Sequence, residues 1–110
     1  MGFRYRLHRK DLPGSPDLVF VSQRKVIFVH GCFWHGHNCA RGNRLPKTNV
    51  DYWKTKIERN RNRDAESVRL LKKADWDVHI VWECELREMD HLRAKLLAFM
   101  TSSVENRSHN

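Results

Sequence analysis

One stretch of sequence decides the fold: Val26-Ile27-Phe28-Val29-His30-Gly31-Cys32-Phe33-Trp34-His35-Gly36-His37-Asn38-Cys39. Its first part is an apolar, β-branched run, which predicts a central strand over 25–30 that is buried on both faces. Its second part is rich in His, Cys, Gly and aromatic residues, and it opens an irregular segment expected over 31–47. A loop of this length without secondary structure of its own is usually functional or held by a metal. The chemistry of the chain is therefore expected at the end of a central strand.

The segments around this stretch predict a single small α/β domain with a mixed sheet over residues 1–100. Upstream we expect an edge strand, a turn-rich loop and the first strand of a hairpin, over 2–8, 11–16 and 17–21. Downstream we expect a helix that is capped by Thr48 or Asn49 and runs to about Ala74. After it we expect a strand, a second helix and a disordered tail, over 77–83, 86–100 and 101–110.

The charge balance favours a polyanionic partner. The 110 residues include 21 Lys and Arg against 13 Asp and Glu, a formal net charge of +8. On so small a domain this excess indicates nucleic acid before membrane, although a merely basic surface is the alternative. No apolar stretch approaches the roughly 20 residues needed to span a bilayer, and no signal peptide is recognisable, so we expect a cytoplasmic protein. Its three cysteines are an odd number, which fits metal ligation better than disulfides.

A structural zinc site is predicted from the cysteines and one histidine. Cys32, His37 and Cys39 lie within eight residues, and Cys84 follows a later strand. Three thiolates and an imidazole are a common tetrahedral zinc set, and four protein ligands leave no open position for chemistry. The alternative is that the cysteines are small buried hydrophobic residues. The spacing also leaves open whether His35 takes the place of His37.

An acid–base and metal site is predicted where the hairpin strands begin and end. Antiparallel pairing brings Asp17, after Pro16, near His30 at the end of the next strand. A carboxylate at a strand edge can hold Mg²⁺ against a phosphate, although a turn residue after proline is the plainer interpretation. His30 and His35 can exchange protons near neutral pH, so together they form a natural acid–base pair.

The long helix carries a carboxylate on its apolar side. Trp53, Ile57, Val68 and Leu71 mark the inward stripe, and Asp64 falls in its middle. A carboxylate there costs free energy unless it is paired. A salt bridge to an arginine and the orientation of a catalytic histidine are the two interpretations, and the pattern does not separate them.

Two further groups of residues are candidates for binding DNA. The opposite helix face offers cations to phosphates, through Lys54, Arg59, Arg61 and Arg63. Aromatic residues in a polar loop and at the helix start can insert between base steps as apolar wedges, and these are Phe33, Trp34 and Trp53.

The chain resembles the very short patch repair (Vsr) endonuclease family over about residues 4–88. The resemblance rests on Leu12-Pro13-Gly14-Ser15-Pro16-Asp17, on the stretch 26–39, on Trp53, Lys56, Ile57, Asn60, Arg63 and Asp64, and on Trp82-Glu83-Cys84. It implies a restriction-endonuclease-like, three-layer α/β domain with a central mixed sheet flanked by helices and a structural zinc site. The usual acidic-x-Lys strand of that fold is replaced here by Phe28-Val29-His30.

The resemblance also implies a role for each candidate residue. Asp17 and the Val29 carbonyl correspond to Mg²⁺ contacts, His30 and His35 to active-site histidines with His35 as general base, and Asp64 to its orienting carboxylate. The zinc ligands are Cys32, His37, Cys39 and Cys84, which favours His37 over His35. Phe33, Trp34 and Trp53 correspond to wedges beside a T·G mismatch. The implied activity is a nick 5′ to the mismatched thymine, which starts excision repair of deaminated methylcytosine.

The resemblance is incomplete at the N-terminus, because members of the family usually carry some forty residues before the position of Phe3. The chain is therefore expected to be a short homologue or a fragment. Competing hypotheses are a zinc-stapled DNA-binding module without catalysis and a nicking enzyme of other specificity. The expected partner is double-stranded DNA with a T·G mismatch, with mismatch-repair proteins as further candidates. We expect a monomer at the bacterial nucleoid, with no membrane partner.

Overall fold

A computed structural model describes residues 4–7, 9–37, 39 and 46–102. Within them the chain forms, in order, strands β1 (Arg6–Leu7), β2 (Leu18–Phe20) and β3 (Lys25–His30), helix α1 (Val50–Lys73), strand β4 (Asp77–Trp82), a 3-10 helix η1 (Glu83–Arg87) and helix α2 (Met89–Thr101). β3, β4 and the long helix match the elements expected from the sequence. β2 is shorter than the strand expected over 17–21, and β1 covers only Arg6–Leu7, which are both exposed, within the strand expected over 2–8.

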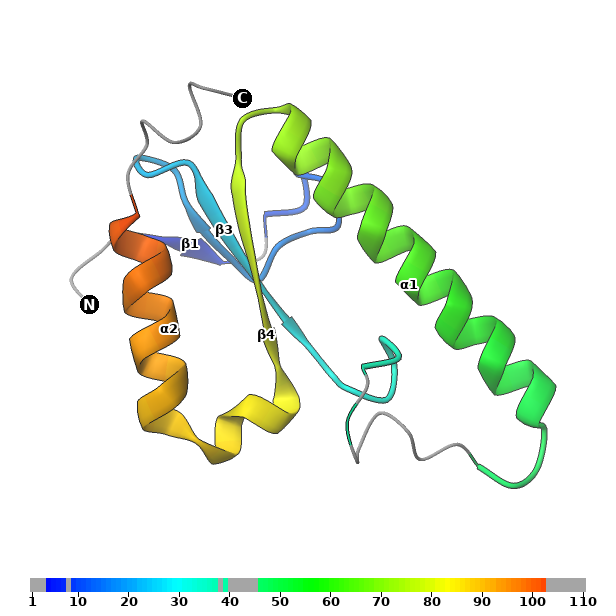
Figure 1. The fold of residues 1–110 in the computed structure, drawn as a ribbon. Coiled ribbons are helices and arrows are strands. Elements are labelled where there is room, and N and C mark those ends of the chain that lie inside the picture. Colours follow the sequence, from blue (N-terminus) through cyan, green and yellow to red (C-terminus); the bar gives the residue numbers. More distant parts are fainter. Residues whose placement is uncertain (1–3, 8, 38, 40–45, 103–110) are drawn as a thin grey trace.

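The four strands form one mixed sheet in the order β1-β2-β3-β4 (Figure 1). β1 and β3 each pair antiparallel with β2, and β3 pairs parallel with β4. β3 is therefore an inner strand of the sheet, as its apolar sequence predicts. The parallel register pairs His30 with Trp82 at the ends of β3 and β4, so both side chains project from the same face.

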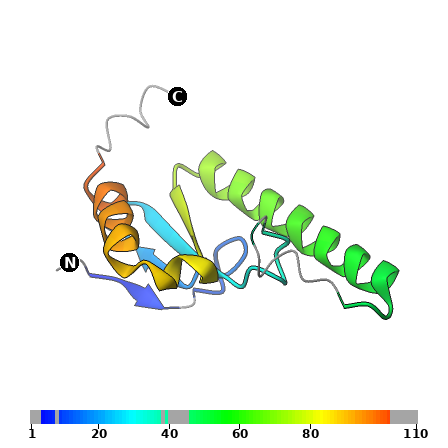
Figure 2. The same ribbon diagram turned by 60° about the horizontal axis from the view of Figure 1, so that its bottom comes forward.

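Two helices cover opposite faces of the sheet, which gives three layers (Figures 1 and 2). On one face Val26 and Phe28 of β3 pack with Leu71 of α1. On the other face Ile27 packs with residues of α2, among them Leu92. This alternation along β3 is what a strand buried between two layers requires, and it confirms the predicted three-layer arrangement.

β3 departs from the predicted burial at its two ends. Val29 is 47% exposed, although alternation along β3 places it on the same face as the buried Ile27. Lys25 is 1% exposed, and its ammonium donates to the carbonyl oxygens of Phe99 and Ser102 at the end of α2. A buried lysine with such partners satisfies carbonyl groups that a helix end leaves unpaired. The expectation of an apolar strand buried throughout is therefore wrong at Val29.

The second helix begins later than predicted. The chain forms η1 before it, and α2 starts at Met89 rather than at residue 86. The Glu85 carboxylate accepts a hydrogen bond from the backbone N–H of Trp82 at 3.0 Å, and this bond closes a tight turn after β4. α2 ends at Thr101, and most of the predicted tail lies outside the described residues.

The long helix α1 follows Asn49, whose φ of 55° lies in the left-handed region. Asn49 occupies the capping position that the sequence predicts, although its side chain makes no capping hydrogen bond. Among the described residues no helix combines the length and the apolar character needed to cross a membrane.

Candidate active site and metal centre

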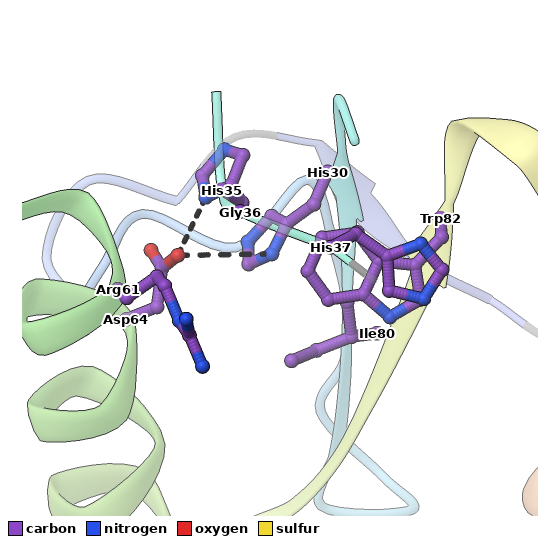
Figure 3. A pocket seen from close by; sticks show the side chains of 8 residues that line it. All are labelled: His30, His35, Gly36, His37, Arg61, Asp64, Ile80 and Trp82. Atoms are coloured by element: carbon purple, nitrogen blue, oxygen red, sulfur yellow. Dashed lines mark hydrogen bonds and ion pairs between the residues drawn. The ribbon is translucent and has the colours of Figure 1, made fainter. Parts of the chain in front are cut away.

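His30, His35 and Asp64 meet where β3 ends against α1. His30 is buried, and the His35 ring lies parallel to it with the centroids 3.8 Å apart and the planes inclined by 3°. Asp64 Oδ2 lies 2.5 Å from His35 Nδ1 and 4.0 Å from His30 Nδ1 (Figure 3). One helix carboxylate therefore faces both histidines and binds His35 directly. Of the two interpretations of Asp64, the structure shows contact with a histidine.

The surroundings of His30 favour its neutral form. Burial lowers the pKa of His30 below its ordinary value of 6.5, and the neighbouring His35 lowers it further, while Asp64 and Asp17 act in the opposite direction. Its Nδ1 atom is buried and has no hydrogen-bond partner among the described residues. Since burial disfavours the charged imidazolium, His30 is held uncharged at neutral pH.

The arrangement of the two rings suits proton transfer better than metal binding. A histidine binds a metal through the nitrogen lone pair, which lies in the plane of the ring. An ion placed between two parallel rings would lie outside both planes, so His30 and His35 cannot share one ion as they stand. The short contact of His35 with Asp64 is instead the geometry of a base that is oriented by a carboxylate.

Asp17 lies beside this triad at the start of β2. Its Oδ2 accepts a hydrogen bond from the Val29 backbone N–H at 2.6 Å. A cleft of about 260 Å³ is lined by Asp17, Val29, His30, His35 and Asp64, together with residues of the 11–16 loop and of α1. The four predicted catalytic residues thus border one cleft. A carboxylate such as Asp17 at an open cleft fits Mg²⁺, which takes few protein oxygens and completes its shell with water and phosphate.

Cys32, His37, Cys39 and Cys84 form a second cluster, and their ligand atoms all lie within 4.8 Å of one another. With Zn–S bonds of about 2.3 Å, tetrahedral donors lie roughly 3.8 Å apart, so this set fits zinc with little movement. Desolvation, together with the neighbouring Cys32 and Cys39 thiols, raises the pKa of Cys84 to about 11. Such thiols become thiolates when a cation binds between them.

A run of tight turns separates the two histidines of the loop. The His35 N–H donates to the Gly31 carbonyl at 3.2 Å, and the His37 N–H donates to the Cys32 carbonyl at 2.9 Å. Gly36 between them has a φ of +64°. As a result His35 points to Asp64, whereas His37 Nδ1 lies 3.6 Å from Cys84 Sγ. The structure thus places His37 with the cysteines and His35 with Asp64, a choice that the spacing alone had left open.

The three predicted DNA-binding aromatics form one cluster. The centroids of Phe33 and Trp34 are 5.1 Å apart, and each lies within 5.7 Å of the Trp53 centroid. Trp34 is 46% exposed, and its backbone carbonyl accepts a hydrogen bond from Asn60 of α1 at 2.7 Å. The cluster therefore presents an exposed ring that is supported from both the loop and the helix.

The predicted basic residues of α1 are exposed, but they do not share one helix face. Arg61 borders a cavity of about 520 Å³ together with His30, His35 and Asp64 (Figure 3). Arg59 and Arg63 border another hollow on the helix, Arg63 also borders the cleft of about 260 Å³, and Lys54 borders none of the three. The expectation of a single basic face is therefore wrong, because residues two apart on a helix point in different directions.

Two residues near the site were not among the predicted functional residues. Asn60 contacts the loop, as described above, and Trp82 lines the cavity beside His30. A signal for Trp82 was available, because two adjacent parallel strands that end at the same level bring their last residues together.

A family model described as DNA mismatch endonuclease Vsr matches residues 1–41. The chain is 56% identical over 96 residues to the type II nicking enzyme V.XorIIP of Xanthomonas oryzae pv. oryzae, and the matching region covers 87% of this chain and 70% of that enzyme. It is 44% identical over 95 residues to V.NmeAIP of Neisseria meningitidis, which covers 86% and 67%. It is 42% identical over 96 residues to the DNA mismatch endonuclease Vsr of Escherichia coli, which covers 87% and 61%.

Proposed function

Because the chain belongs to the Vsr family of DNA endonucleases, we propose that it is a Mg²⁺-dependent enzyme that nicks DNA 5′ to the thymine of a T·G mismatch. The observation that carries the proposal is the cleft in which Asp17, His30, His35 and Asp64 meet. Its place in the cell is proposed to be the bacterial cytoplasm, at the nucleoid. We assign the fold to the restriction-endonuclease-like class, since a mixed sheet between helix layers presents these residues at one strand end.

The proposed reaction is hydrolysis of one phosphodiester bond. His35 removes a proton from a water molecule as the water oxygen attacks phosphorus. The bond to the leaving sugar oxygen breaks, and that oxygen takes up a proton from solvent water. Asp64 orients His35 and stabilises its charged form. Asp17 and the Val29 carbonyl are the residues that would hold Mg²⁺, whose charge offsets the negative charge that builds up on the phosphate.

The second cluster is proposed to be a structural zinc site. Cys32, His37, Cys39 and Cys84 would supply all four ligands and leave no position for water or substrate. The expected effect of the site is to fix the 31–39 loop to the end of β4, a strand that comes much later in the sequence.

Mismatch recognition is proposed to depend on the aromatic cluster. Opening a base step costs a few kcal/mol and costs least where pairing is already weak. Trp34→Ala should therefore narrow the preference for T·G over T·A duplex. Arg59→Ala should weaken binding to both duplexes about equally, because its charge serves phosphates of any sequence. Binding titrations on the two duplexes measure both effects. An unchanged preference for the T·G duplex in folded Trp34→Ala protein would contradict the proposal that the Trp34 ring inserts between base steps.

A nicking enzyme of another specificity is the second candidate, because several relatives are named type II nicking enzymes rather than mismatch endonucleases. A binding module without catalysis is disfavoured by the 2.5 Å contact between His35 and Asp64, which a module of that kind does not need.

A nicking assay on T·G and T·A duplexes, with and without added Mg²⁺, tests the proposal. Mg²⁺ is omitted rather than chelated, because a chelator would also remove zinc. We expect Mg²⁺-dependent nicking of the T·G duplex and none in Asp17→Asn. The asparagine oxygen can still accept the Val29 N–H, so this variant should remain folded. Asp90→Asn, the same charge change on α2, is the control and should remain active. Equal nicking of both duplexes would show another specificity, and nicking without Mg²⁺ would refute the metal assignment.

A further inference from the structure

Trp82 lies between the two clusters of the site. It ends β4 and is paired in register with His30, the last residue of β3. Its ring stacks on that of His37, with the centroids 4.2 Å apart and the planes inclined by 9°. The same indole meets His30 edge-on at 5.3 Å and approaches His35 at 6.3 Å (Figure 3). One side chain thus contacts a candidate zinc ligand and both proposed acid–base residues.

The orientation of His30 depends on ring packing. Its Nδ1 makes no hydrogen bond within the described part of the chain, and Asp64 Oδ2, which faces that atom, lies 4.0 Å away, beyond hydrogen-bond distance. Aromatic neighbours surround it instead, namely Phe28 at 5.5 Å, His35 at 3.8 Å and Trp82 at 5.3 Å. Removing one of them leaves space in which the His30 ring can turn, and His35 rests on that ring. Edge-to-face pairs of this kind favour a defined relative orientation.

The stack with His37 limits the movement of the indole in turn. His37 belongs to the four-residue cluster, and its backbone is fixed by the hydrogen bond to the Cys32 carbonyl. The Trp82 backbone is held by the pairing of β4 with β3 and by a hydrogen bond from its backbone N–H to the Glu85 carboxylate. The indole is therefore the rigid element against which the histidine pair packs.

We propose that Trp82 is a positioning residue that holds His30, and through it His35, in the orientation needed for proton transfer, with its own ring fixed by the stack on His37. This role rests on the proposed function of the two histidines. It gives the zinc cluster a second consequence besides stabilising the fold, because the cluster fixes one face of the Trp82 ring. Geometric errors of about 1 Å at a reacting group can reduce a rate by about 100-fold.

The proposal is tested with Trp82→Leu, which removes the ring, and Trp82→Phe, which keeps an aromatic plane. The matched control is Trp76→Leu, which removes a buried indole of the same core layer at the other end of β4. All proteins are compared with zinc bound, as verified by metal analysis, and at a temperature at which each is folded. If Trp82→Leu does not fold, Trp82→Met replaces it, because methionine fills irregular space without a ring.

Two readouts are measured. NMR relaxation of the ¹³C-labelled histidine rings reports the mobility of His30 without any need for activity. We expect a more mobile His30 ring in Trp82→Leu, near wild-type mobility in Trp82→Phe, and no change in Trp76→Leu. In the nicking assay kcat should fall by about 10- to 100-fold in Trp82→Leu with little change in KM, and Trp82→Phe should recover most of it.

The outcomes separate this proposal from the proposed function. An unchanged His30 ring in zinc-loaded Trp82→Leu would overturn the positioning role, even if the protein nicks DNA as expected. A change confined to KM would overturn it as well. A wild-type protein that does not nick DNA would refute the proposed function, while the NMR comparison would still decide whether Trp82 orients His30.

Discussion

Asp64 illustrates how far a single residue can be interpreted from a helical pattern. Its place in an apolar stripe predicts a partner, but arginine and histidine satisfied the pattern equally well. The partner is His35, which is fixed by loop turns that no periodicity reveals. If His35 Nδ1–H donates to Asp64, its Nε2 atom is the nitrogen left to accept a proton in the proposed reaction, and the Asp64 carboxylate would balance the charge.

Replacing Asp64 by asparagine tests this role at the level of one atom. Asp64→Asn keeps the shape but removes the charge that stabilises protonated His35, so kcat for nicking should fall by about 10²- to 10⁴-fold. Single-turnover nicking on the T·G duplex measures it. Glu66→Gln is the matched control, because Glu66 lies on the same helix and pairs only with exposed Arg69 among the contacts described. Equal rates in Asp64→Asn and wild type would remove Asp64 from the mechanism.

The residue types of the site were predictable, but several of their contacts were not. Cys32, Cys39 and Cys84 with one histidine already indicated a metal. Spacing could not choose between His35 and His37, because side-chain direction in an irregular loop depends on the hydrogen bonds of each turn. Antiparallel pairing already predicted Asp17 near the end of the next strand, but not the hydrogen bond that its carboxylate accepts from the Val29 N–H.

At the scale of elements, the loop over 31–37 is seated against α1 at Gly36. A Cβ atom added there would lie 2.7 Å from Arg61 Cδ and 2.8 Å from Ile57 Cγ2, and the φ of +64° disfavours any other residue. Gly36→Ala should therefore lower the free energy of unfolding by about 1–2 kcal/mol from backbone strain, and by more from the overlap. It should also lower the nicking rate, since the same loop carries His35.

Urea denaturation measures the stability change, with Gly31→Ala as control. An added Cβ at Gly31 meets nothing closer than 3.5 Å, so that variant should remain close to wild type. Equal stability of the two variants would show that the loop does not depend on close contact with α1.

Among the elements, β3, β4 and α1 were predicted well because their apolar residues recur regularly, whereas β1 and β2 are shorter than the predicted strands. The segment after β4 was not, since a 3-10 turn and the first turn of an α-helix have nearly the same residue preferences. The hydrogen bond from the Trp82 backbone N–H to the Glu85 carboxylate accompanies the 3-10 turn, and it is a local contact between residues three apart. The burial of Lys25 was also beyond the sequence, because lysine is almost never fully buried unless it is paired.

At the scale of the whole molecule, the sheet divides the apolar interior into two thin cores. The cysteine cluster lies outside both cores and joins the loop after β3 to η1, where Cys84 donates its N–H to Cys32 Sγ at 3.3 Å. In a domain with so little core on each face, ligation free energy contributes directly to folding. The proposed zinc ligation should therefore decide whether the described fold is stable.

Cys84→Ser should bind less zinc and melt at a lower temperature, and chelation should do the same to the wild-type protein. Metal analysis together with thermal melts measures both changes. Omitting Mg²⁺ is the control and should leave the melting temperature unchanged, because Mg²⁺ takes few protein ligands and keeps several water molecules. Folded wild-type protein that contains no zinc and melts normally would contradict this prediction.

The stability of the whole molecule should also depend on pH through His79. This residue lies on β4 under α2, with its ring centroid 5.2 Å from that of Phe99. Its Nε2 atom is buried and unpaired within the described residues. Burial lowers the pKa of His79 below 6.5, Lys95 lowers it further, and Glu85 opposes the shift. The folded protein therefore binds a proton at His79 less readily than the unfolded chain does.

The sign follows from this difference in proton binding. Above the unfolded pKa neither state is protonated at His79, and the residue adds no pH dependence. As the pH falls below about 6.5 the unfolded chain takes up a proton first, so the free energy of unfolding decreases. Denaturation curves from about pH 5 to 8 should show this loss, and the His79→Leu protein should lose less. Zinc release at low pH affects both proteins alike, so the difference between them isolates His79. His91→Leu, a change at an exposed histidine of α2, should behave as wild type. If the free energy of unfolding depends on pH in the same way for wild type and His79→Leu, protonation of His79 does not destabilise the folded protein.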